Sequence, residues 1–318
     1  MNSLWLSNNK LINNNFIKEI DTSNTSNKTL LETDVCIIGA GIFGLTCAYY
    51  LSNLGYRVTV LEKDKIGEKT TGNTTAKITS QHGLFYSYLA NSYSQKFAQD
   101  YLEANEQAIK NIKNIIDKEK IKCDFEYKNS YVYTTKKEDL KFIKKEQKAI
   151  ENLGFNCEYV TKTGLPFEIE GAICFKNQAQ FHPLKYLNGL CHCITKNNNE
   201  IYTNSTVFDV QKENDFYITF SNNFNVKSKY VIVATHYPFI NFPGFYFAKM
   251  YQSTSYLIAV DTKKTLFNGM YISATNPILS FRTANYNGKE LLLIGGGEHK
   301  TGQPTSYQNS YGMLEEEA

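Results

Sequence analysis

Three glycines at residues 39, 41 and 44, in the stretch Gly-Ala-Gly-Ile-Phe-Gly, have the spacing of a turn that binds the phosphates of a dinucleotide. In such a turn Gly39 allows a tight bend, Gly41 lets the backbone approach a pyrophosphate, and Gly44 lets the next helix pack closely. The N-terminus of that helix would face the phosphates with unpaired N–H groups and the positive end of its dipole. The spacing predicts a phosphate site, although a glycine-rich packing joint has the same pattern.

Glu62 is the second residue whose position indicates a nucleotide. It ends a predicted strand about 20 residues after the glycine turn, where a carboxylate would accept both ribose hydroxyls of an adenosine. A 2′-phosphate beside this carboxylate would be repelled, so Glu62 disfavours NADP. NAD and FAD share this pattern, and both stay open on these residues alone.

The residues around the turn have the pattern of a strand, a helix and a second strand. Residues 34–38 are a short apolar run typical of a strand buried on both faces, and 42–54 read as a helix that ends at Gly55. Residues 56–62 are rich in β-branched side chains, as in a strand. This order predicts a βαβ unit with the glycine turn between its first strand and its helix.

The rest of the chain alternates helix and strand patterns. Amphipathic spacing predicts helices over 97–116 and 139–153, and a proline begins a third helix over 183–194. A strand is predicted over 201–210, and 230–234 has the pattern of a buried strand of a parallel sheet.

An antiparallel sheet is predicted toward the end of the chain. Strands over 256–260 and 270–273 precede a hairpin that turns at Asn287-Gly288, a dipeptide favoured in tight hairpin turns. No linker-like segment separates these blocks, so the domains are expected to be interleaved.

Length and composition exclude several classes of protein. The 318 residues exceed the usual size of one hydrophobic core, which favours two domains. With 42% hydrophobic residues the chain is globular, and no run of about 18 apolar residues could span a bilayer. The 34 basic and 31 acidic residues are spread along the chain, without the concentrated basic field that nucleic acid requires.

The cysteines and the first residues of the chain bear on the cellular compartment of the protein. Seven cysteines without a CxxC pair favour a reducing cytoplasm over a disulfide framework. The run Cys191-His192-Cys193 falls in a predicted helix, where its side chains point to different faces, so no metal site is expected. Residues 1–29 are polar, have no apolar signal core, and are expected to form an extended or disordered arm.

Residues 70–83, with the sequence TTGNTTAKITSQHG, resemble the segment beneath the flavin in FAD-dependent oxidoreductases of the glycine/D-amino-acid oxidase (DAO) family. The resemblance continues through 180–183, 234–239, 251–260 and 295–302, and so covers nearly the whole chain. It is closest to the branch whose full-length members carry a C-terminal Rieske iron-sulfur domain.

The resemblance implies an α/β fold in which a Rossmann-like, glutathione-reductase-like FAD-binding domain is interleaved with a substrate domain of α+β type, built on a mixed or antiparallel sheet. The expected division is an N-terminal arm over 1–30, an FAD-binding domain over 31–90, 165–236 and 290–318, and a substrate domain over 91–164 and 237–289.

The resemblance also implies a reaction. Members of the family oxidise a C–N bond, commonly of an amine or amino acid, by hydride transfer to the flavin, which oxygen or another acceptor then reoxidises. The expected partners are therefore FAD, a small amine or amino-acid substrate and an electron acceptor. Glu62 would hold the ribose, the threonines after it would line the pyrophosphate and the ring, and Val207 would contact adenine through its backbone. The candidate cofactor residues are Gly39, Gly41, Ile42, Phe43, Gly44, Glu62, Lys63, Thr70, Thr71, Thr75, Ala76, Val207, Ala234 and Thr235.

Two residues are candidates for the substrate side. Arg282 could clamp a substrate carboxylate or form an exposed salt bridge on a hairpin. His82 could lie near the flavin or serve as a structural histidine, and His236 could position a loop.

The chain departs from the full-length pattern at its end. It stops at Ala318, before a stretch with an Asp-Gly-x-Pro-like motif and a late glycine-rich turn, and it lacks the Rieske cysteines and histidines. We therefore expect an incomplete C-terminal end of the DAO domain and no iron-sulfur centre, with a homo-oligomer or a completing chain as one solution. A truncated or non-catalytic flavin-binding protein is one alternative function, and an NAD-dependent dehydrogenase is another.

Overall fold

A computed structural model describes residues 3–7, 18, 29–262, 266–303 and 307–318. The chain divides into two compact units, each assembled from separate stretches of sequence. The first unit comprises Met1–Thr74, Glu119–Cys123 and His182–Gln252. The second comprises Thr75–Lys118, Asp124–Phe181 and Ser253–Ala318.

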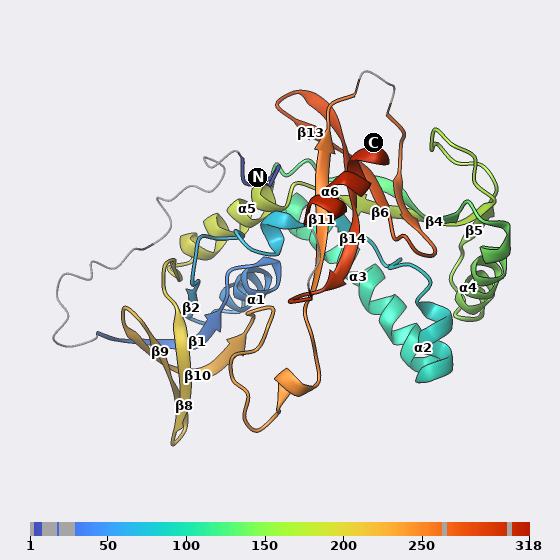
Figure 1. The fold of residues 1–318 in the computed structure, drawn as a ribbon. Coiled ribbons are helices and arrows are strands. Elements are labelled where there is room, and N and C mark those ends of the chain that lie inside the picture. The colour runs from blue at the N-terminus through green and yellow to red at the C-terminus, as the bar shows by residue number, and fades with distance from the viewer. Residues whose placement is uncertain (1–2, 8–17, 19–28, 263–265, 304–306) are drawn as a thin grey trace. The chain divides into compact units, whose positions relative to one another are not determined.

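The first unit is built on a six-stranded sheet in the order β7-β2-β1-β10-β9-β8 (Figure 1). The four strands from β7 to β10 in this order are parallel, while β9 and β8 are antiparallel to their neighbours. Helices α1 and α5 contact each other. The bounds are β1 (Leu30–Ile38), α1 (Ile42–Asn53), β2 (Val58–Leu61), α5 (Pro183–Lys196), β7 (Glu200–Tyr202), β8 (Val207–Glu213), β9 (Phe216–Ser221) and β10 (Asn225–Val233).

The predicted βαβ unit is confirmed in β1, α1 and β2. The apolar second half of β1 is buried, and so is all of β2, as in a parallel sheet covered on both faces. Helix α1 ends beside Gly55, whose φ of +87° is the left-handed conformation that stops a helix. β1 starts earlier than predicted because its first residues pair with β10 from Asn225 onward.

The second unit is built on an eight-stranded sheet whose main order is β11-β14-β13-β12-β4-β6-β3, with β5 also paired to β6. β12 and β4 are parallel, and the other pairs are antiparallel. The strands are β3 (Lys77–Ile78), β4 (Glu126–Thr134), β5 (Glu158–Val160), β6 (Gly171–Gln180), β11 (Ser253–Val260), β12 (Met270–Ser273), β13 (Ser280–Tyr286) and β14 (Lys289–Lys300). The helices are α2 (Tyr86–Ser92), α3 (Gln95–Glu119), α4 (Leu140–Asn152) and α6 (Tyr307–Glu316).

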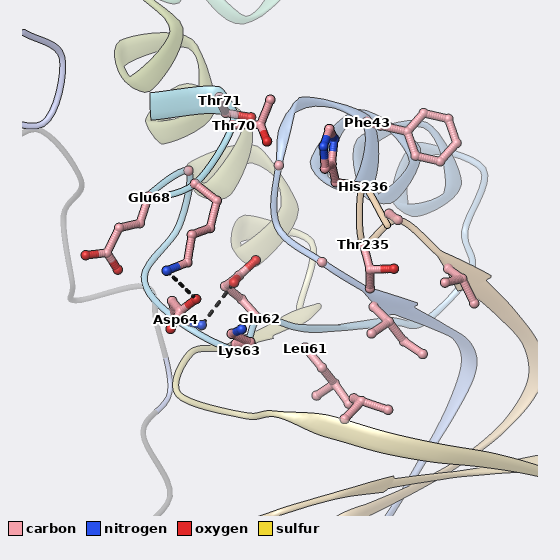
Figure 2. Close-up of a pocket in the computed structure, with 18 of the residues that line it drawn as sticks. Phe43, Leu61, Glu62, Lys63, Asp64, Glu68, Thr70, Thr71, Thr235 and His236 are labelled. Atoms are coloured by element: carbon pink, nitrogen blue, oxygen red, sulfur yellow. Dashed lines mark hydrogen bonds and ion pairs between the residues drawn. The ribbon is translucent and has the colours of Figure 1, made fainter. Parts of the chain in front are cut away.

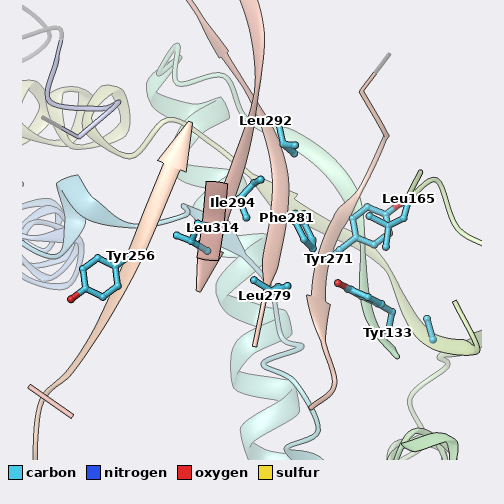
Figure 3. Close-up of a cluster of buried hydrophobic side chains, with 10 residues drawn as sticks. Tyr133, Leu165, Tyr256, Tyr271, Leu279, Phe281, Leu292, Ile294 and Leu314 are labelled. Carbon is cyan, nitrogen blue, oxygen red and sulfur yellow. The ribbon is translucent and has the colours of Figure 1, made fainter. Parts of the chain in front are cut away.

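A hydrophobic cluster holds α6 and the central strands of this sheet together (Figure 3). Tyr271, Ile294 and Leu314 come from β12, β14 and α6, and all three are fully buried. Removing each such side chain from water contributes about 1.5–3 kcal/mol to folding. The rings of Tyr131 and Tyr271 stack with their centroids 4.8 Å apart, which joins β4 to β12.

The hairpin predicted at Asn287-Gly288 is confirmed between β13 and β14. Both residues have positive φ, +52° and +81°, as the tight turn of a twisted hairpin requires. The single strand predicted over 201–210 is instead two strands, β7 and β8, because the chain turns at Asn204 with a φ of +51°.

The two units differ from the expected domain boundaries in five stretches, one of which is 119–123, expected in the substrate domain and found in the first unit. Residues 75–90 and 165–181 lie in the second unit because β3 and β6 belong to its sheet. Residues 290–318 also lie there, since β14 pairs with both β11 and β13. The stretch 237–252, expected in the substrate domain, belongs to the first unit.

The start of the chain also differs from expectation. Residues 3–7 form a turn, and the Trp5 side chain is only 1% exposed, so the prediction of an extended or disordered arm is wrong for them. Most other residues of that arm lie outside the described residues. Within the described part of the chain, no helix combines the length and apolar character needed to cross a membrane.

Glu146 makes a testable contribution to the second unit. Its carboxylate is buried and accepts the Tyr86 and Ser87 N–H groups, at 2.6 and 2.8 Å, at the start of α2. Glu146→Gln leaves one of these N–H groups opposite an amide NH2, so we expect a loss of about 1–3 kcal/mol in the free energy of unfolding. Denaturant unfolding measures it, with the exposed Glu151→Gln on the same helix as control. If the two variants were equally stable, the hydrogen bonds from Glu146 to the start of α2 would not contribute to stability.

Candidate functional site

A cavity of about 540 Å³ opens in the first unit where β1, β2 and β10 end and α1 begins (Figure 2). This is the carboxyl edge of the parallel strands, where ligands bind in open α/β sheets. Gly41, Glu62, Thr71, Val207 and Thr235 are among the residues that line it.

The three glycines of the turn serve different purposes in the structure. A Cβ atom on Gly39 would lie 2.5 Å from the Ala234 carbonyl oxygen, and one on Gly44 would lie 2.0 Å from the Gly39 carbonyl oxygen. These two glycines are therefore required by the packing of the protein itself. A Cβ atom on Gly41 would meet only the Thr71 hydroxyl, at 3.3 Å, so the protein does not use the space left by this missing side chain. That space lies at the cavity and fits the close approach of a pyrophosphate.

The N-terminus of α1 is suited to an anion. Gly41 caps the helix with extended backbone and no side-chain hydrogen bond, and the first turn contains no acidic residue. The Ile42 N–H donates a long hydrogen bond of 3.4 Å to the Thr71 hydroxyl. The first N–H groups of a helix have no partners within it and carry its positive dipole end, so a phosphate group would complete this terminus.

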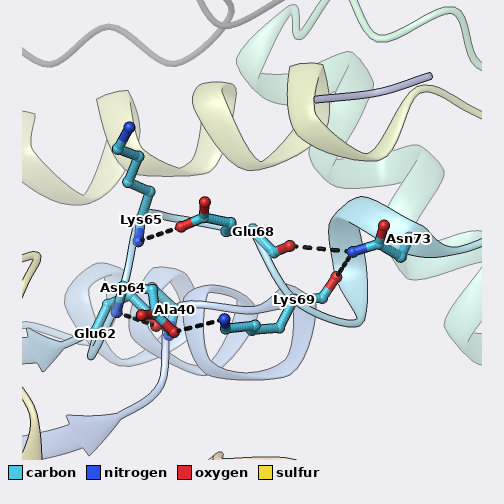
Figure 4. Close-up of polar contacts among 7 residues, drawn as sticks. All are labelled: Ala40, Glu62, Asp64, Lys65, Glu68, Lys69 and Asn73. Carbon is cyan, nitrogen blue, oxygen red and sulfur yellow. Dashed lines mark hydrogen bonds and ion pairs between the residues drawn. The ribbon is translucent and has the colours of Figure 1, made fainter. Parts of the chain in front are cut away.

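Glu62 is held in place by two backbone N–H groups (Figure 4). Its Oε2 accepts from Ala40 at 2.7 Å, and its Oε1 accepts from Asp64 at 3.0 Å. A carboxylate oxygen has a second lone pair, so both oxygens keep the capacity to accept a ribose hydroxyl. The carboxylate is thus oriented before any nucleotide arrives.

The loop after β2 folds back on itself toward α1 (Figure 4). The Lys69 ammonium pairs with Asp64 at 3.3 Å, and the Asn73 amide donates to the carbonyls of Glu68 and Lys69, at 3.1 and 2.6 Å. These contacts bring the threonine pair at 70 and 71 to the cavity, as Figure 2 shows.

Most of the predicted cofactor residues come together at this cavity. The predicted residues that line it are Gly39, Gly41, Ile42, Phe43, Glu62, Lys63, Thr70, Thr71, Val207, Ala234 and Thr235. Gly44 lies behind the turn, and Thr75 and Ala76 belong to the second unit. The cavity also has lining residues that the sequence did not indicate, such as Asp64, Lys65 and Ser205. Nearness to Glu62 in sequence was a usable signal for the first two, whereas Ser205 is brought in by its N–H bond to the Glu62 carbonyl.

Arg282 is buried in the second unit. It is 3% exposed, so the alternative of an exposed hairpin salt bridge is wrong. Its Nη1 donates to the carbonyls of Thr75 and Ala76, at 3.0 and 2.8 Å, and its Nε donates to the Thr283 carbonyl. Ala76 has a φ of +53°, which is uncommon for a residue with a side chain. The guanidinium therefore holds a strained turn, and its role as a carboxylate clamp stays a prediction.

Lys77 lies near Arg282 and donates hydrogen bonds to two uncharged oxygens. Its ammonium donates to the Tyr271 carbonyl at 2.7 Å and to the Ser280 hydroxyl at 2.6 Å. Burial, and then repulsion by Arg282, lowers the pKa of Lys77 to about 7. Burial likewise lowers the pKa of Arg282 to about 10.

His82 is exposed in the second unit, and its Nδ1 lies 2.9 Å from the Tyr101 hydroxyl. This contact orients the imidazole. Its predicted place near the flavin stays a prediction.

A parallel sheet, a three-glycine turn and a ribose carboxylate at one cavity define a dinucleotide-binding unit of Rossmann type. The profile of the DAO family, described as FAD dependent oxidoreductase, matches residues 34–317. The chain belongs to this family, whose model is described as FAD-dependent, and this confirms the predicted family and fold class.

Curated relatives agree with this assignment. The chain is 35% identical over 283 residues to YhfW of Bacillus subtilis, which is described as a Rieske 2Fe-2S iron-sulfur protein, with 89% of this chain and 56% of that protein covered. It is 25% identical to the gamma-glutamylputrescine oxidoreductase of Escherichia coli, over 67% of this chain and 50% of the relative. The chain thus spans about half the length of the curated relatives it matches.

Solved structures share the fold at low sequence identity. The L-proline dehydrogenase of P. horikoshii aligns with a TM-score of 0.72 and 17% identity, over 91% of this chain and 76% of that one. The L-α-glycerophosphate oxidase of Mycoplasma pneumoniae, solved with FAD bound, aligns with a TM-score of 0.68 and 17% identity, over 90% and 77%.

The different purposes of Gly41 and Gly44 predict different outcomes for the same substitution. Gly41→Ala should leave the free energy of unfolding within about 1 kcal/mol of wild type, while a methyl group in the cavity weakens FAD binding at least about tenfold. Gly44→Ala should destabilise the fold by about 3 kcal/mol or more, because its Cβ atom overlaps a carbonyl oxygen. Thermal unfolding and FAD titration of both variants measure this. Unchanged FAD affinity in Gly41→Ala would exclude the turn as the pyrophosphate site.

The lowered pKa of Lys77 predicts a pH dependence of stability. Between about pH 7 and its ordinary value of 10.5, the unfolded state binds more protons at this residue than the folded state. The contribution of Lys77 to the free energy of unfolding is therefore lowest below pH 7 and rises with pH through this window. Lys77→Met should remove a rise of about 1–3 kcal/mol, whereas the exposed Lys144→Met should keep it. Denaturant unfolding across the window tests this, and parallel curves for wild type and Lys77→Met would refute it.

Proposed function

We propose that this protein is an FAD-dependent oxidoreductase that oxidises the C–N bond of a small amine or amino acid. The observation that carries the proposal is the cavity at the end of β1, where the unused space at Gly41 meets the oriented carboxylate of Glu62. Together these two features fit the pyrophosphate and the ribose of one adenosine dinucleotide.

The proposed roles of the residues combine the resemblance to the family with their positions around the cavity. The α1 N-terminus and Thr71 would hold the pyrophosphate, Glu62 the ribose, and Val207 the adenine through its backbone. Bound FAD supplies the hydride acceptor. The protein's part is to bind and orient this cofactor, and oxygen or another acceptor would take the electrons afterwards.

The substrate class is supported by the names of similar proteins. The names of two of these proteins contain gamma-glutamylputrescine and L-proline, and both compounds carry an oxidisable C–N bond.

The alternative of an NAD-dependent dehydrogenase is not favoured, because the family is FAD-dependent. The seven cysteines, which include no CxxC pair, support our proposal of a reducing compartment, the cytoplasm.

Anaerobic reduction of the bound flavin tests the proposal. The chain is saturated with FAD, oxygen is removed, and amines and amino acids are added one at a time while the visible flavin absorption is recorded. We expect at least one compound to bleach the flavin, and oxygen to restore the colour.

Two other results would replace or overturn the proposed activity. A chain that binds FAD but is bleached by dithionite only, and by none of the compounds, would be a flavin-binding protein without this activity. Glu62→Ala is the control for site occupancy, since loss of the ribose contact should weaken FAD binding in that variant. A wild-type chain that takes up no FAD at saturating concentration would overturn the proposal.

A further inference from the structure

The residues Ser3–Ser7, here called the N-terminal clasp, form a compact turn in the first unit. The N–H groups of Leu6 and Ser7 both donate to the Ser3 carbonyl, at 3.1 and 2.9 Å. Trp5, at the centre of the turn, is 1% exposed and is among the largest fully buried side chains. A buried tryptophan this close to the chain start indicates that the clasp is docked on the protein.

The clasp docks on the loop that follows β2. The Ser3 hydroxyl donates to the Gly72 carbonyl, and the Trp5 indole N–H donates to the Thr74 carbonyl at 2.7 Å. Leu6 lies directly over Gly72, where an added Cβ atom would come within 3.1 Å of both methyl groups of the leucine. The same Cβ atom would lie 2.4 Å from the Gly67 carbonyl oxygen, so the loop itself requires a glycine here, and Leu6 of the clasp fills the space beside it.

The same loop forms one wall of the FAD cavity. Thr71 precedes Gly72 in the short 3-10 turn Thr71–Asn73 and lines the cavity. Its hydroxyl accepts the Ile42 N–H at the start of α1 and lies 3.3 Å from the position of a Cβ atom on Gly41. Thr71 therefore connects the two features: it contacts the start of α1, and the next residue, Gly72, contacts the clasp.

Helix α5 supports the loop as well. A Cβ atom on Gly67 would lie 2.6 Å from a methyl carbon of Leu184 and 2.9 Å from one of Leu187. The Trp5 ring also packs edge-on against the His182 imidazole, the N-cap of α5, with centroids 4.8 Å apart. Both α5 and the clasp therefore hold the loop.

We propose that the N-terminal clasp is a positioning element for FAD, which keeps the Thr70–Thr74 loop against the start of α1. The inference rests on the proposed binding of FAD at this cavity. An undocked loop would have to be ordered when the cofactor binds, and this cost in conformational entropy would weaken affinity. A docked clasp lowers that cost, and by reciprocity bound FAD strengthens the docking of the clasp.

Trp5 is the only tryptophan of the chain, so its fluorescence reports the clasp directly. FAD is titrated into the wild-type apoprotein, and Trp5 emission should fall with the same Kd as that given by the change in flavin fluorescence. Trp5→Ala should weaken FAD binding at least about tenfold. Trp5→Phe and Ser3→Ala, which each remove one hydrogen bond and leave most packing intact, should weaken it about two- to fivefold.

A destabilised control separates positioning from general loss of stability. Val58→Ala removes buried side-chain volume at the start of β2, at the opposite end of this strand from the cavity. It should lower the melting temperature as Trp5→Ala does, yet keep the wild-type Kd for FAD at a temperature where both variants are folded.

A measurement without FAD tests the clasp apart from the proposed function. Trypsin can cut after Lys63, Lys65 and Lys69, in the stretch that joins β2 to the Thr70–Thr74 loop. Cleavage there should be faster in Trp5→Ala and Ser3→Ala than in wild type or Val58→Ala. If wild type binds FAD but the clasp variants match its Kd and its cleavage rate, the positioning role is refuted and the proposed function stands. If faster cleavage is seen but no chain binds FAD, the clasp orders the loop and the proposed function is refuted, together with the clasp's role toward FAD.

Discussion

The close contact between Gly44 and the Gly39 carbonyl is the constraint on which the cofactor site depends. It lets α1 start directly beside the end of β1, with its N-terminus at the carboxyl edge of the sheet. Because Gly39 is itself pressed against Ala234 at the end of β10, the turn is fixed from two sides. A helix that started further out would leave its N–H groups away from the cavity, and the positive end of its dipole would no longer face it.

The ribose carboxylate depends on this same turn. Glu62 accepts the N–H of Ala40, which lies between the first two glycines, so the end of β2 and the turn hold each other. A buried backbone N–H needs a partner, and here a side chain that also faces the nucleotide cavity provides it. This shared use explains why the carboxylate can be oriented in advance, and pre-organisation of this kind lowers the cost of binding.

The sequence predicted those features whose contacting residues lie close together in the chain, and missed those whose contacts join distant segments. The glycine turn, α1 and the place of Glu62 depend on residues within one βαβ unit, so spacing was sufficient to find them. The burial of Arg282 depends on the carbonyls of residues 75 and 76, about two hundred positions away in the chain, and no local pattern carries that information. The boundaries of the two units were placed differently for the same reason, since strands such as β14 are assigned by their pairing partners and not by their own composition.

Trp5 shows the limit of reading a segment by its average composition. The first residues are mostly polar, which is typical of a disordered arm, yet one large side chain finds a buried place and two hydrogen bonds fasten its turn to the loop. A buried aromatic side chain contributes several kcal/mol, enough to order a turn of a few residues against the entropy that favours an unfolded arm. The contact lies 69 positions from the clasp in sequence, beside a glycine outside the phosphate-binding pattern. Gly72 lies in the segment that resembles the flavin-binding stretch, and the structure adds that Leu6 packs against it. A single stretch of backbone therefore forms a wall of the cofactor cavity and contacts the clasp.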